Sequence, residues 1–148
     1  MDIKEIVKEA LVVSDAATFE EALAAMENHK TNTLLVTDEE GELCGEVIMT
    51  DILEAIVPES FDGDVAMEKL STDDGLRAAI KDAMDKPVSE FMSVDFTALE
   101  MGDNMLNVIA TAIAHNRSSI PVVNKDNRPV GIISRRGIKH IIRKFSEA

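Results

Sequence analysis

Side chains that could carry out catalysis are few and scattered in this sequence. Cys44 is the only cysteine, and the three histidines, His29, His115 and His140, stand far apart. The sequence has no glycine-rich phosphate loop ending in Lys-Ser/Thr, no Gly-x-Gly-x-x-Gly, no Cys/His metal spacing and no Gly-x-Ser-x-Gly elbow. A nucleophile paired with a base is therefore not indicated. We expect a binding module without catalytic residues or metal ligands, not an enzyme.

Charge is unevenly distributed along the chain. The formal net charge is −13; residues 1–57 carry 14 acidic and 3 basic residues, whereas residues 97–148 carry 4 acidic and 8 basic ones. The net charge argues against nucleic acid and anionic membranes as partners, because their phosphates would repel it. The basic C-terminal segment could attract a phosphorylated ligand or an acidic partner, or it could be a solvated helix face.

No leader or membrane segment is indicated. The N-terminal residues MDIKEIVKEA contain no continuous apolar stretch, and no stretch approaches the ~18 apolar residues that span a bilayer. Cys44 cannot form an intrachain disulfide, and its apolar neighbours are typical of a small buried residue in a reducing compartment. We expect a soluble cytoplasmic protein.

A repeat organises the chain. A shift of 86 residues aligns residues 11–53 with 97–139 without a gap, and it places Gly45 on Gly131 and His29 on His115. We expect an α/β fold of two β-α-β-β-α repeats packed about a pseudo-two-fold axis. The expected division is a first repeat with an N-terminal helix over 1–57, a helical connector over 58–86 and a second repeat over 87–148.

Local signals predict the elements of each copy. Strands are expected at 11–13, 33–37 and 43–48, and again near 96–99 and at 120–123 and 130–134. Thr18 and Glu21 predict a capping box for the first helix, and Thr50 is expected to cap the helix that ends before Pro58. Helices are also expected from 103 or 104 and over about 135–145, and the connector is expected to be helical over about 65–84, with a break near 71–73.

The sequence resembles the cystathionine-β-synthase (CBS) domain family. The resemblance is carried by SIPVVNKDNRPVGIIS at 119–134, and by LLVTDEEG at 34–41 with GEVIMTDIL at 45–53. A tandem pair of these domains is called a Bateman module. The resemblance implies sheets that pack together with two clefts between them, dimers shaped as a flat disc, and binding of AMP, ADP, ATP or S-adenosylmethionine. Such modules regulate an attached or partner protein and are not catalysts.

The resemblance also implies ligand-binding positions. In the family, a turn with the pattern Gly-x-x-Thr/Ser-x-x-Asp directs its hydroxyl to phosphate and its carboxylate to ribose. The first copy keeps Asp51 but has Ile48 at the hydroxyl position, and the second keeps Ser134 but has Gly137 at the carboxylate position. One implied cleft comprises Thr50, Asp51, Ser93, Ser118, Ser119 and Ile120. The other implied cleft comprises Asn32, Thr33, Leu34, Ser134, Arg135 and Arg136.

Two functions remain open from the sequence. The first is a homodimeric, ligand-sensing module that needs no cofactor and acts on a partner protein or through self-association. The second is a scaffold for dimerisation whose clefts are vestigial, which the residues at 48 and 137 favour. His29 and His115 occupy equivalent helix ends, which indicates a structural role. The basic face of Arg136, Lys139, His140, Arg143 and Lys144 is typical of solvated surface.

Overall fold

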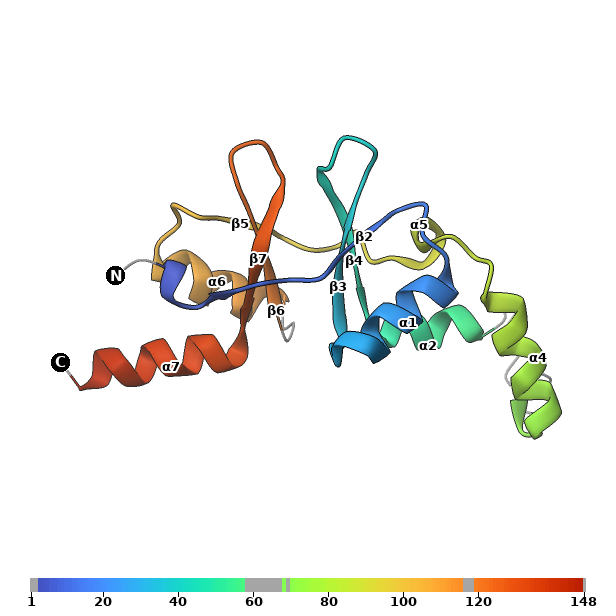
Figure 1. Ribbon diagram of the computed structural model, residues 1–148. Coiled ribbons are helices and arrows are strands. Elements are labelled where there is room, and N and C mark those ends of the chain that lie inside the picture. Colours follow the sequence, from blue (N-terminus) through green and yellow to red (C-terminus); the bar gives the residue numbers. More distant parts are fainter. Residues whose placement is uncertain (1–2, 58–67, 69, 116–118, 148) are drawn as a thin grey trace.

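The protein consists of two small sheets that lie side by side. The computed structural model (Figure 1) describes residues 3–57, 68, 70–115 and 119–147. One sheet has the strand order β2-β3-β4 and the other the order β1-β7-β6-β5. In Figure 1, α6 and α7 lie on the outer side of one sheet, whereas α1, α2 and α4 lie on the outer side of the other. The expected α/β architecture is confirmed.

The first repeat follows the expected order. Its elements are β2 (Val12–Ser14), α1 (Phe19–His29), β3 (Thr33–Thr37), β4 (Leu43–Ile48) and α2 (Met49–Ile56). The capping box is confirmed, because Thr18 Oγ1 accepts a hydrogen bond from the Glu21 amide at 3.2 Å and Glu21 Oε1 accepts one from the Thr18 amide at 3.4 Å. The cap of α2 differs from the expectation, since β4 continues directly into α2. Ile48 is the N-cap residue and Thr50 lies inside the helix, so the expected Thr50 cap is wrong.

The second repeat has the same order. Its elements are β5 (Leu99–Glu100), α6 (Met105–His115), β6 (Ser119–Val123), β7 (Pro129–Ser134) and α7 (Arg135–Ser146). The turns of the two hairpins match as well: Gly41 has φ 82° and Asn127, 86 residues later, has φ 60°. Both are residue types that adopt the left-handed conformation readily. The repeat therefore extends to backbone conformation.

Helices also occur in the connector. Thr72 caps α4 (Asp73–Ala83), because its hydroxyl oxygen accepts a hydrogen bond from the Gly75 amide at 3.0 Å. A short helix, α5 (Val88–Phe91), follows. The helix expected from residue 65 begins in a part of the chain, 58–67 and 69, that lies outside the described residues.

The segment that precedes each repeat packs on the other repeat. The N-terminal segment forms a 3-10 turn, η1 (Ile3–Glu5), and the strand β1 (Val7–Lys8), which pairs antiparallel with β7. The N-terminal helix is thus a single 3-10 turn, since pairing with β7 begins at Val7. In the same way, the Ser93 amide and carbonyl exchange hydrogen bonds of 2.8 and 3.0 Å with Glu46 of β4. Each repeat thus receives a segment from outside its own sequence unit.

Glycine permits both of these crossings. A Cβ atom at Gly131 would lie 2.3 Å from the Lys8 carbonyl oxygen, and one at Gly45 would lie 2.5 Å from Met92 Sδ. Both distances are shorter than van der Waals contact allows. The close approach of the crossing segment therefore requires glycine at Gly131, where the obstacle is backbone, whereas at Gly45 the flexible Met92 side chain is the neighbour.

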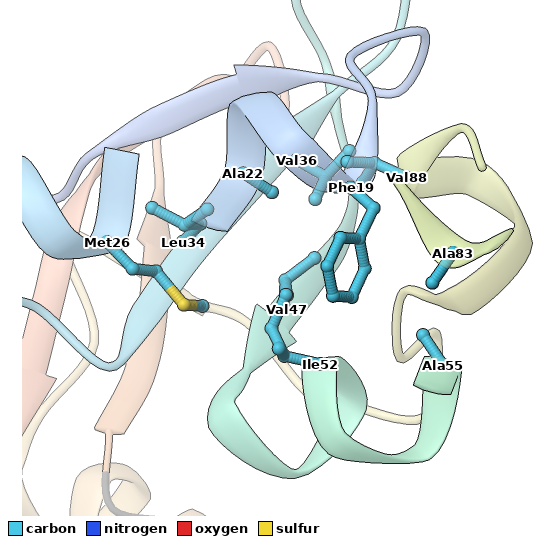
Figure 2. Close-up of a cluster of buried hydrophobic side chains, with 10 residues drawn as sticks. All are labelled: Phe19, Ala22, Met26, Leu34, Val36, Val47, Ile52, Ala55, Ala83 and Val88. Carbon is cyan, nitrogen blue, oxygen red and sulfur yellow. The ribbon is translucent and has the colours of Figure 1, made fainter. Parts of the chain in front are cut away.

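Each repeat has its own apolar core. Figure 2 shows the first core, in which the Phe19 ring points toward side chains from β4, α2 and α4, and α5 adds Val88. The second core contains Ile3 and Ile6 of the crossing segment together with residues of its own repeat. A third cluster joins the sheets through Leu35, Leu43 and Val123. It lies near a hydrogen bond of 2.8 Å from the Leu43 amide to the Asn127 carbonyl.

We predict that Gly131→Ala destabilises the protein by about 1–3 kcal/mol, because the new methyl group must displace the backbone of β1. Gly102→Ala is the matched control: a Cβ atom at Gly102 would meet nothing within 4 Å. Its effect should stay within about 0.5 kcal/mol. Urea denaturation measures both free energies of unfolding. Equal values for the two variants would contradict the proposed role of the glycine.

Candidate functional site

Asp51 lies where the start of α2 meets the segment that precedes the second repeat. Its side chain is buried, with 7% exposure. Oδ2 accepts a hydrogen bond from the Ile48 amide at 2.8 Å, and Oδ1 accepts one from Ser93 Oγ at 2.8 Å. Of the first set of candidate residues, the structure therefore brings Asp51 and Ser93 together. Thr50 lies beside them on α2 and is exposed.

A cavity of about 550 Å³ adjoins Asp51. Lys86 forms part of its wall and donates a hydrogen bond from Nζ to the Ala55 carbonyl at 3.1 Å, where it stabilises the C-terminal end of α2. Glu54, Glu90 and Phe91 also line the cavity. Its volume lies within the range of roughly 300–1,000 Å³ that small-molecule sites occupy. The site combines a buried carboxylate, a cation and an aromatic ring.

The equivalent position in the second repeat is closed. Ser134 Oγ accepts a hydrogen bond from the Gly137 amide at 3.2 Å and so caps α7. A Cβ atom at Gly137 would lie 3.2 Å from Ile6 Cβ, which leaves little room for a carboxylate. The shift of 86 residues places Gly137 where Asp51 stands. Glu46 pairs with Ser93 and its counterpart Ile132 pairs with Lys8, so Lys8 takes the place of Ser93. At Gly137 the crossing segment presents the apolar Ile6 instead of a hydroxyl.

Asp51 and Ser134 each supply a different half of the same helix-capping motif. A full capping box has a hydroxyl at the N-cap and a carboxylate three residues later. At α2 only the carboxylate of Asp51 is present, and at α7 only the hydroxyl of Ser134. Each half satisfies one amide at its helix start. The one residue of the ligand-binding pattern that each copy keeps therefore also caps the helix that begins there.

A second cavity of about 290 Å³ lies between the repeats. Of the second set of candidates, Thr33 lines it, together with Ile132 of β7 and residues 9–11. Leu34 is buried in the first core, whereas Asn32, Arg135 and Arg136 are exposed. His29, for which the sequence indicates a structural role, also lines this cavity.

The two equivalent histidines differ in their surroundings. His115 Nε2 lies 2.6 Å from Thr97 Oγ1, whereas the residue at the position of Thr97 in the first repeat is Leu11. His29 consequently lacks an equivalent hydroxyl. Comparison of the two copies position by position could have revealed this difference from the sequence.

The remaining candidates lie apart from Asp51. Ser119 and Ile120 are buried, and together with Thr97 and His115 they line a pocket of only about 10 Å³. A space of that size holds no more than about one water molecule. Ser118 lies outside the described residues.

In the described part of the chain, no group of three or more His, Cys, Asp or Glu side chains could hold a metal ion. Burial, followed by the charges of Asp15 and Asp38, raises the pKa of the Cys44 thiol above its ordinary value, so the thiol stays protonated near neutral pH. Among the described helices, none is long and apolar enough to cross a membrane.

The contact between Asp51 and Ser93 predicts energetic coupling. We expect Asp51→Ala and Ser93→Ala to show an interaction energy of roughly 0.5–3 kcal/mol in a double-mutant cycle, because each removes the other's partner. Asp51→Ala alone should cost about 1 kcal/mol more than Ser93→Ala, since it also leaves the Ile48 amide without its cap. Thr50→Ala paired with Ser93→Ala provides the control. Coupling as large in the control as in the Asp51 cycle would contradict the assigned contact.

The comparisons with known proteins agree on one family. Residues 3–58 and 88–144 match the CBS domain, and no curated protein matches the chain in sequence. A CBS domain-containing protein from Bacillus anthracis has a TM-score of 0.77 and 20% identity, over 97% of this chain and 94% of that one.

Two further similar structures were determined with ligands. CBSX2 in complex with AMP, a protein of Arabidopsis thaliana, has a TM-score of 0.71 and 18% identity, over 98% of both chains. The CBS domain pair of protein MJ0100, in complex with 5′-methylthioadenosine and S-adenosyl-L-methionine, has a TM-score of 0.69 and 22% identity, over 96% of this chain and 99% of that one. With both repeats matched by the family and the whole fold shared with domain pairs, this chain belongs to the CBS domain family as a tandem pair.

Proposed function

We propose that the chain is a regulatory module that binds an adenosine-containing metabolite, such as AMP, ADP, ATP or S-adenosylmethionine, at Asp51. The observation that carries this proposal is the buried Asp51 carboxylate at the junction of the two repeats, beside a cavity of about 550 Å³. A carboxylate can accept two hydrogen bonds from the cis-diol of a ribose. The structures of CBSX2 with AMP and of MJ0100 with S-adenosyl-L-methionine support this ligand class.

Ligand binding at Asp51 would be coupled to the crossing segment. Both carboxylate oxygens already accept hydrogen bonds, and the side chain is almost fully covered. A ribose would therefore replace Ser93 Oγ at Oδ1 and leave the bond to the Ile48 amide intact. Ser93 belongs to the segment that leads into the second repeat and pairs with Glu46 of β4, so we propose that its release favours a different arrangement of the repeats. A ligand shifts that equilibrium only by its difference in affinity for the two arrangements.

We propose one adenosine site per chain. The second repeat has no ribose carboxylate at Gly137, and Ile6 occupies the adjoining space. The alternative function is a scaffold with vestigial clefts. It is favoured by the hydrogen bonds of Asp51, because both of its carboxylate oxygens already accept hydrogen bonds from the protein itself. In either case we expect the chain to act through a partner protein or through self-association. We place it in the cytoplasm, a reducing compartment that suits the lone Cys44.

Thermal denaturation with AMP, ADP, ATP and S-adenosylmethionine tests the proposal. A ligand at ~100 times its dissociation constant adds about 2.7 kcal/mol, which raises the midpoint of a domain of this size by roughly 5–10 °C. Asp51→Ala should abolish the shift measured from its own ligand-free midpoint. Ser93→Ala should enlarge the shift, because no hydroxyl then competes for Oδ1. Glu54→Ala, which alters an exposed residue of the same cavity, is the control.

The outcomes separate the two functions. If none of the four compounds raises the midpoint of the wild-type protein, the chain does not sense adenosine-containing metabolites, and the scaffold function is favoured. A shift that survives in Asp51→Ala would assign the ligand to another cleft. A smaller shift in Ser93→Ala would show that the serine hydroxyl contributes to binding and does not compete with the ligand.

A further inference from the structure

Carboxylates dominate the described wall of the cavity beside Asp51. Asp51 and Glu54 of α2 and Glu90 of α5 line it, and Lys86 is the one basic residue among its described lining residues. No ion pair within the described ranges involves any of these three carboxylates. Lys86 Nζ instead donates a hydrogen bond to the Ala55 carbonyl oxygen at 3.1 Å. Three acidic side chains and one basic side chain therefore line this space, so its net charge is negative.

Both ends of α2 make this wall more negative. The start of a helix can bind an anion through its free amides, but the Ile48 amide already donates to Asp51 Oδ2 at 2.8 Å. A carboxylate of the protein therefore occupies the anion position at that end. Ala55 and Val57, which also line the cavity, lie at the C-terminal end of α2, where the helix dipole is negative. The helix thus favours positive rather than negative charge in the cavity.

An aromatic ring also belongs to this wall. Phe91 lines the cavity and is half-buried. Its ring lies edge-to-face on Phe19, with the centroids 5.7 Å apart and an interplanar angle of 65°. Phe19 is fully buried in the first core, so this contact holds the Phe91 ring in place. Because the face of an aromatic ring attracts a cation within about 6 Å, the wall offers a cation a π system as well as carboxylates.

We propose that the site at Asp51 selects an adenosine ligand with a positively charged 5′ substituent, the class of S-adenosylmethionine, over AMP, ADP and ATP. This inference rests on the proposed function, because Asp51 holds the ribose in either case. The sulfonium and ammonium groups of such a ligand meet Glu54, Glu90 and Phe91. A 5′-phosphate would meet the same carboxylates and be repelled, and such repulsion of the wrong ligand is a common source of specificity.

Lys86 fits the remaining charge of this ligand. An ammonium group has three N–H donors, and one donor of Lys86 is directed to the Ala55 carbonyl. Its other donors can bind the carboxylate of the ligand's amino-acid part. The positive and negative groups of S-adenosylmethionine are thus the complement of Glu54, Glu90 and Lys86.

Isothermal titration calorimetry of the whole chain with S-adenosylmethionine and S-adenosylhomocysteine tests the charge preference. The two compounds differ only in the methyl group that gives the sulfur its positive charge. We expect the sulfonium compound to bind about tenfold more tightly, and AMP and ATP to bind more weakly than it does. Added salt should narrow both differences, because Glu54 and Glu90 are exposed and their charges are screened.

Substitutions at Glu90 test its part in the selection. Glu90→Gln keeps the shape of the side chain and removes its charge, so the preference for the sulfonium compound should fall about threefold. Glu90→Lys should also raise the affinity for AMP, because attraction of the phosphate replaces repulsion. Glu27→Gln is the matched control, since it removes the same charge from an exposed residue of α1 that does not line the cavity. It should leave both preferences unchanged.

The outcomes distinguish the charge selection from the site itself. AMP or ATP that binds the wild-type protein as tightly as S-adenosylmethionine, and fails to bind Asp51→Ala, would overturn the selection and leave the proposed function standing. Equal affinities for S-adenosylmethionine and S-adenosylhomocysteine, or an undiminished preference in Glu90→Gln, would overturn the selection as well. If none of the four compounds binds, the selection and the adenosine site are both overturned.

Discussion

The close approach of a crossing segment to a glycine in each sheet is the contact on which the rest of the structure depends. The missing side chain of Gly131 leaves room for the backbone of β1, and that of Gly45 leaves room for the Met92 side chain. Because these segments enter the opposite repeat, neither repeat completes its core alone: Ile3 and Ile6 fill the second core, and Val88 fills the first. Each repeat therefore needs a segment from outside its own sequence unit to complete its core.

The same crossing gives opposite results at the two candidate sites. In the first repeat it brings a hydroxyl, Ser93, to the carboxylate of Asp51. In the second it brings Ile6 against Gly137, where a carboxylate would meet an apolar side chain and a backbone carbonyl oxygen. The two residues at each site depend on each other. Loss of the acid at 137 is therefore matched by the apolar character of the N-terminal segment.

Local patterns predicted much of this fold, whereas contacts between distant segments escaped them. The capping box of α1 and the glycine shared by the hairpins follow from residues a few positions apart. Threonine favours the N-cap position, so the sequence predicts Thr50 as the N-cap of α2. In the structure β4 continues directly into α2, and Ile48 is therefore the N-cap residue. The N-terminal helix is limited to one 3-10 turn for a similar reason, since the chain pairs with β7 from Val7 onward. The partnership of Asp51 with Ser93 was implied only by family resemblance.

The uneven charge of the sequence is explained by where its helices lie. A basic C-terminal segment could have served a phosphate in the cleft, but Ser134, the residue nearest that role, uses its hydroxyl to cap α7. Arg136, Lys139 and His140 are exposed on α7, which lies on the outer side of its sheet in Figure 1. The acids Glu20 and Glu27 occupy the outer side of the other repeat. Exposed residues of opposite charge thus lie on the outer helices of the two repeats, acidic on α1 and basic on α7.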